Sequence, residues 1–148
     1  ERSRVSEALT TLNALDKAMD VWILDHGYPS LQGTQHYTFL GDDSSHKGQL
    51  VLDFIAWDCS VTTRPHSHQK LDCASKDFVY SAALDRNGVQ VSAGRYKNAN
   101  MRDFEGHYLI EIWTLPTGEK ERTCYYADDL GEKVCTNLVA QGWAIDTL

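Results

Sequence analysis

The sequence predicts an α+β domain in which one long amphipathic helix packs on an antiparallel sheet of four or five strands. Three observations support this fold class: an opening segment with helical apolar spacing, a middle section of strand-like runs and turn residues, and four cysteines at loop-like separations. A chain of 148 residues is the size of one domain. Within 1–148 we expect a helical spine at 1–27, a connecting loop at 28–49, the sheet at 50–126 and a C-terminal disulfide region at 124–148.

The helical spine runs from about Arg4 to His26, and its apolar residues recur at steps of three and four. The opposite face carries charged and polar side chains, so one side of the helix packs and the other meets water. Gly27 and Pro29 end the helix, the glycine as a left-handed cap and the proline because it cannot continue a helix. The apolar face comprises Val5, Ala8, Leu12, Leu15, Met19, Trp22 and Ile23.

The middle of the chain has the composition of strands separated by turns. The polar connecting loop contains a short strand or turn around Tyr37–Leu40. The dipeptide Asn87-Gly88 between two strand-like runs indicates a β-hairpin, and Pro116-Thr117-Gly118 indicates a further turn. The expected strands are Leu50–Trp57, Asp77–Leu84, Val89–Tyr96, His107–Leu115 and Glu121–Tyr126. A second helix is expected at Gly131–Gln141, ended by Gly142 and followed by a short tail.

The four cysteines are expected to form two disulfides in an oxidising compartment, with buried free thiols as the alternative. They include no C-x-x-C pair, which argues against zinc, an iron–sulfur cluster and a thioredoxin-like redox motif. Three connectivities are possible, and sequential pairing closes two short loops, each worth about 3 kcal/mol. The sequential pairs are Cys59 with Cys73 and Cys124 with Cys135.

The charge of the chain disfavours polyanionic partners. It has 14 lysines and arginines against 21 aspartates and glutamates, a formal net charge of −7. Such a charge repels phosphate backbones and anionic lipid, so we expect no nucleic-acid partner. No apolar run approaches the length of a membrane span, and we find no signal peptide. We therefore expect either a soluble protein or the soluble part of an anchored one.

The sequence contains no motif that predicts catalysis or a cofactor. G-x-S-x-G, G-x-G-x-x-G, the P-loop and H-E-x-x-H are all absent, so we expect no enzyme activity. His66 and His68 form an H-x-H pattern that would hold a transition metal with His107 or Asp72 as third ligand. We prefer solvated histidines and no metal site there.

Calcium is a second metal alternative. The pairs Asp42-Asp43 and Asp128-Asp129 supply the hard oxygen ligands that calcium prefers. Neither pair lies in an EF-hand loop, so the expected cofactor set is empty, with calcium as the alternative.

The opening helix resembles the soluble half of the N-terminal helix of type IV pilins and type II secretion pseudopilins. The resemblance lies in Ser3–Leu9, in Ala14–Trp22 and in the helix exit Leu24–Pro29. Near the end, Cys124 and Cys135 look like the disulfide that bounds the C-terminal region of a pilin. The middle of the chain adds no family motif, and the pair Cys59 and Cys73 is not a general family feature.

The resemblance implies a structural role. Pilin-like subunits are anchored in the bacterial inner membrane by an apolar, methylated N-terminal segment, and then stack their helices into a surface or periplasmic filament. That segment would directly precede Glu1 and is not part of this sequence. The residues that would pack the helix on the sheet are Val5, Leu12, Leu15, Met19 and Trp22.

The same resemblance assigns two surfaces. Arg2, Arg4 and Glu7 would contact neighbouring subunits, with a solvated helix face as the alternative. The C-terminal loop would carry adhesion or partner recognition, with plain structural capping as the alternative; its candidate residues are Tyr125, Tyr126, Asp128 and Asp129.

The functional expectation is therefore a type IV pilin, serving attachment, motility or uptake, with a secretion pseudopilin as the alternative. A third hypothesis, from a different class, is a secreted metal-binding protein or enzyme that uses the loop of His66 and His68.

Overall fold

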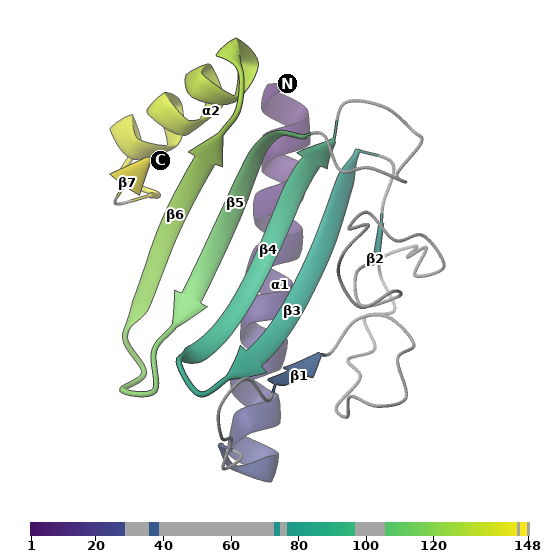
Figure 1. Ribbon diagram of the computed structural model, residues 1–148, viewed down its shortest axis with the longest axis vertical. Coiled ribbons are helices and arrows are strands. Elements are labelled where there is room, and N and C mark those ends of the chain that lie inside the picture. The colour runs from purple at the N-terminus through teal and green to yellow at the C-terminus, as the bar shows by residue number, and fades with distance from the viewer. Residues whose placement is uncertain (29–35, 39–72, 75–76, 97–105, 145, 148) are drawn as a thin grey trace.

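The computed structural model describes residues 1–28, 36–38, 73–74, 77–96, 106–144 and 146–147. In this part of the chain the fold is α+β: helix α1 (Arg2–His26) lies across one face of an antiparallel sheet (Figure 1). The four long strands are β3 (Phe78–Asp85), β4 (Gly88–Tyr96), β5 (Gly106–Thr114) and β6 (Lys120–Tyr126), each paired with the next. The predicted fold class is confirmed at this level.

Three short strands extend the sheet at its edges. Strands β1 (His36–Thr38) and β2 (Cys73–Ala74) both pair antiparallel with β3. Strand β7 (Asp146–Thr147) pairs with β6 in the parallel direction, where the sequence predicted only a tail. The predicted strand Leu50–Trp57 lies outside the described residues, as does most of the connecting loop.

Successive side chains of a strand point to opposite faces of the sheet, so every second residue of the long strands lies on the face that α1 covers and buries. The register sets Tyr80, Ala93 and Ile110 side by side across β3, β4 and β5, and all three are almost fully buried. From the helix, Ala8, Leu12, Leu15 and Met19 have no exposed surface in the same core. Val5 and Trp22 are partly buried and pack against it.

The two ends of α1 differ from one another in their surroundings. The N-terminal turns lie beside the sheet and α2, whereas the last turns extend past the hairpin ends of the long strands (Figure 1). Gly27 follows the helix with φ 76° and ψ 164°, so it has a positive φ but not the left-handed helical conformation that was predicted. Tyr28 then donates a 2.6 Å hydrogen bond to the carbonyl oxygen of Asp85, which ties the helix exit to β3.

The predicted hairpin between β3 and β4 is present, and its turn lies at Asp85–Gly88, between the two predicted strands. Asp85 pairs with Gly88, so Arg86 and Asn87 form the two-residue turn and Gly88 already belongs to β4. The backbone N–H of Asn87 donates to the Asp85 carboxylate at 2.7 Å, which stabilises the turn locally.

Helix α2 (Asp129–Ala140) packs against β5 and β6, and it starts and ends slightly earlier than predicted. The disulfide between Cys124 on β6 and Cys135 on α2 is present, with a Cα–Cα distance of 5.4 Å and both cysteines fully buried. This pair was one of the predicted disulfides, and it fastens α2 to the sheet. The pairing of Cys59 with Cys73 involves a residue outside the described ranges.

Candidate functional site

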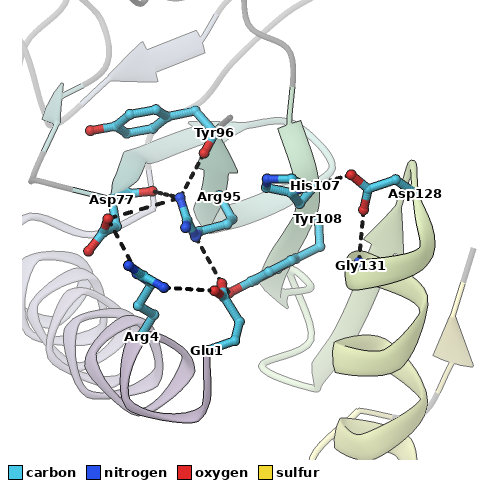
Figure 2. A network of polar contacts seen from close by, with 9 residues as sticks. All are labelled: Glu1, Arg4, Asp77, Arg95, Tyr96, His107, Tyr108, Asp128 and Gly131. Carbon is cyan, nitrogen blue, oxygen red and sulfur yellow. Dashed lines mark hydrogen bonds and ion pairs between the residues drawn. The ribbon is translucent and has the colours of Figure 1, made fainter. Parts of the chain in front are cut away.

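A network of polar contacts joins the first turn of α1 to the sheet (Figure 2). The carboxylate of Glu1 accepts hydrogen bonds from Arg95 Nε on β4 and from the Tyr108 hydroxyl on β5, both at 2.8 Å. Arg4 Nη1, one turn along the helix, donates to the same carboxylate at 3.2 Å. Glu1 therefore holds the start of α1 against two neighbouring strands at once.

Arg95 also anchors the backbone around it. Its Nη1 donates to the carbonyl oxygen of Tyr96 at 2.7 Å, and Asp77 lies 4.0 Å from the same atom. Asp77 also pairs with Arg4, whose Nε lies 3.4 Å from the carboxylate. The side chain of Arg95 is only 13% exposed, so these acceptors and the carboxylate of Glu1 replace the water that the guanidinium has lost.

The network keeps Glu1 ionised. Partial burial alone would raise the pKa of the Glu1 carboxyl, but the hydrogen bonds from Arg95 and Tyr108 outweigh it and hold the pKa below its usual range. Burial and the facing carboxylate of Glu1 together raise the pKa of the Tyr108 hydroxyl, so the phenol stays protonated and remains a donor.

We expect Glu1→Gln to lower the free energy of unfolding by about 1–2 kcal/mol at neutral pH. Because the pKa of Glu1 is depressed in the folded state, its contribution is complete above the unfolded pKa of about 4.3 and is lost as the pH falls through the lower folded value. Urea denaturation at pH 7, 5 and 3 should therefore show a difference between variant and wild type that shrinks on acidification.

Glu7→Gln is the matched control, since Glu7 is exposed on the same helix. It is expected to change the free energy of unfolding by less than about 0.5 kcal/mol at each pH. Equal effects of the two substitutions would contradict the role assigned to Glu1.

A second polar tie holds the middle of α1. Lys120 Nζ on β6 lies 2.9 Å from the Asp16 carboxylate and 3.2 Å from that of Asp20, and it donates to the Thr114 hydroxyl at 2.9 Å. Partial burial alone would lower the pKa of Lys120, but the hydrogen bonds to the two aspartates outweigh it and raise that pKa. Lys120 therefore remains a cation that binds the helix to the start of β6.

His107 and Asp128 connect β5 to the start of α2 (Figure 2). Asp128 is the N-cap of the helix: its Oδ1 accepts the backbone N–H of Gly131 at 2.9 Å, and its Oδ2 pairs with Nδ1 of His107. Both carboxylate oxygens are thus occupied within the molecule. Asp128 therefore caps a helix, which is the structural role that the sequence left open as the alternative to recognition.

The other residues predicted for recognition lie around the same connection. Tyr126 is 40% exposed, Tyr125 is half-buried and Asp129 is exposed in the first turn of α2. These surface positions do not test the recognition role, which stays a prediction. The predicted loop itself is the end of β6 followed directly by a helix.

The residues predicted for subunit contacts separate into two groups. Arg4 is engaged with Glu1 and Asp77, whereas Arg2 and Glu7 are exposed and form no ion pair with other described residues. Arg2 lies at the rim of an open groove of about 610 Å³ between the first turns of α1 and helix α2. Val5, Leu9, Val134 and Leu138 are the apolar residues within this groove that also belong to or pack on the core.

The predicted metal ligands are not brought together in the described part of the chain. His66, His68, Asp72 and the pair Asp42-Asp43 lie outside it, and His107 is engaged with Asp128. No group of three or more histidine, cysteine, aspartate or glutamate side chains suited to a metal occurs among the described residues. Neither described helix has both the length and the apolar character needed to cross a bilayer.

Sequence reasoning overlooked Glu1, Asp77, Arg95 and Tyr108 as a unit. One pattern would have indicated it: the alternation of β4 places Arg95 on the same face as Val91 and Ala93. A charged residue on the apolar face of a strand requires a buried partner. The identity of that partner depends on where the helix crosses the sheet.

Comparison with known proteins finds no matching protein family, no matching curated protein and no matching solved structure. The class of the protein is defined by its fold: an α+β domain with an N-terminal helix on a four-stranded antiparallel sheet and a disulfide that fastens the C-terminal helix.

Proposed function

We propose that this chain is a structural subunit of an extracellular or periplasmic filament, resembling a type IV pilin. The observation that supports the proposal most is the 25-residue helix α1 held along the four-stranded sheet, with the Cys124–Cys135 disulfide closing the C-terminal region. Helix α1 is about 37 Å long and packs on the sheet along one apolar face. This arrangement suits a subunit whose helix continues into a filament core.

The polar contacts agree with a structural rather than a catalytic role. Glu1, Arg4, Asp77 and Arg95 are bound to one another, and Asp128 caps a helix while holding His107. Side chains used in this way fix the helices on the sheet. We therefore propose that the chain is not an enzyme, that it needs no cofactor and that its partners are other filament subunits.

The terminal disulfide favours a pilin over a type II secretion pseudopilin, because a disulfide-bounded C-terminal region is more usual in pilins. On this proposal an apolar segment before Glu1 anchors the subunit in the bacterial inner membrane. The subunit then assembles into a filament at the cell surface or in the periplasm.

The upstream coding sequence tests the proposal directly. We expect an apolar segment of about 20 residues, the length of a membrane span, immediately before Glu1 and preceded by a processing site. Antibodies against the domain should then label filaments in the fraction sheared from intact cells. A secretion signal with its cleavage site, or another soluble domain, in place of the apolar segment would overturn the proposal.

A further inference from the structure

Two unlike surfaces lie at the two ends of α1. The first is the helix tip, which we define as Val21, Leu24 and Asp25. Val21 is 56% exposed and Leu24 is 84% exposed. Leu24 and Asp25 follow Val21 by three and four positions, so both lie on the same side of the helix as Val21. All three belong to the C-terminal turns of α1, and the C-terminal end of the helix extends past the long strands (Figure 1). The tip therefore presents two exposed aliphatic side chains, Val21 and Leu24.

The second surface is the groove between α1 and α2. Its apolar floor is formed by Val5, Leu9, Val134 and Leu138, and Arg2 and Lys133 stand at its rim. Its volume of about 610 Å³ falls in the range of pockets that hold small-molecule ligands, so it has room for one or two side chains. Neither Arg2 nor Lys133 forms an ion pair with another described residue.

The charges of the two surfaces are complementary. The tip carries Asp25 and lies at the C-terminal end of α1, where the helix dipole adds partial negative charge. The groove is lined by the basic side chains of Arg2 and Lys133 and by Glu1, whose carboxylate is already bound by Arg95 and Tyr108. In a chain with a net charge of −7, copies repel each other overall, so a basic rim facing an acidic tip selects one relative orientation.

From this complementarity we propose that the helix tip of one copy docks in the α1–α2 groove of a second copy. The inference rests on the proposed function, because it takes the partner to be another subunit of the same chain. The two surfaces differ and lie at opposite ends of one rod, so the contact is heterologous. A contact of this type leaves a free tip and a free groove on every assembly, and repeating it extends a filament unless the rotation closes a ring.

Cysteine cross-linking of the full chain tests the contact. Ser6 lines the groove and is exposed, and it lies 18 residues from Leu24, about 27 Å along the helix. A disulfide cannot span that distance within one copy. Under mild oxidation the double variant Ser6→Cys/Leu24→Cys should therefore give a ladder of dimers, trimers and longer chains on non-reducing gels. Each single variant can give at most a dimer.

Charge reversal supplies the specificity control. Adding Lys133→Glu to the double variant should reduce the ladder at least tenfold, and adding Asp25→Lys as well should restore it. Arg86→Glu makes the same change in charge at an exposed turn outside both surfaces and should leave the ladder unchanged. A ladder that is absent, or that is insensitive to Lys133→Glu, would overturn the docking.

The two proposals fail in different ways. If cells assemble labelled filaments but the double variant forms no ladder, the filament role stands and this contact is wrong. If the charge-sensitive ladder forms but the segment before Glu1 is a soluble domain, the docking stands and the filament role falls.

Discussion

Replacing Leu15 with alanine is expected to lower the free energy of unfolding by about 3–5 kcal/mol. Leu15 has no exposed surface and lies in the middle of α1, in the core between helix and sheet. The polar ties through Glu1 and Lys120 hold the helix on either side of this position, so the helix cannot settle into the cavity. Urea denaturation monitored by circular dichroism measures the loss.

Leu24→Ala is the matched control, because it makes the same change on the same helix at a side chain that is 84% exposed. At concentrations where the chain is monomeric, we expect its effect to stay within about 0.5 kcal/mol. Similar losses for the two variants would contradict the packing of α1 on the sheet.

Gly131→Ala is expected to destabilise the protein by about 3 kcal/mol, although the same change inside an exposed helix stabilises by about 1 kcal/mol. A Cβ at Gly131 would overlap the backbone carbonyl oxygen of His107 and would lie 2.8 Å from the Cβ of Tyr126. Since β5, β6 and the disulfide fix α2 in place, the overlap can be relieved only by moving the helix from the sheet. Thermal and urea denaturation report the loss.

Gly142→Ala separates this steric effect from backbone strain. Gly142 has φ 76° after α2, but a Cβ there would meet nothing within 4 Å. We expect a cost of about 1 kcal/mol from the positive φ alone. A larger loss for Gly142→Ala than for Gly131→Ala would show that the close approach of α2 to β5 is not as described.

The elements with strong periodicity could be predicted from the sequence. The recurrence of apolar residues every three or four positions predicted the bounds of α1 to within a few residues. The alternation of apolar residues in β5 placed Tyr108, Ile110 and Ile112 on one face, and all three are buried. The turn at Asp85–Gly88 lies between the two strands that the sequence predicts, although Asp85 and Gly88 already pair as strand residues. A two-residue hairpin is set by the pairing of both strands, and local composition does not specify that register.

The polar contacts could not be predicted in the same way. Glu1 is 94 residues from Arg95 and 107 residues from Tyr108. The sequence around each of these residues does not indicate which distant residues it will contact. The family resemblance makes Asp128 a candidate for recognition, and the acidic pair Asp128-Asp129 makes it a candidate calcium ligand. Its use as a cap that also holds His107 depends on α2 starting beside β5.

The sequence by itself determined the long helix and the antiparallel strands, because both depend on periodicity, whereas the pairing of Cys124 with Cys135 was one of three possible connectivities. Only the tertiary structure decided which charged side chains meet and where a groove and an exposed helix tip remain. The physical reason is that hydrophobic burial is non-directional, so an apolar stripe requires a partner surface without specifying where on that surface each polar residue will lie.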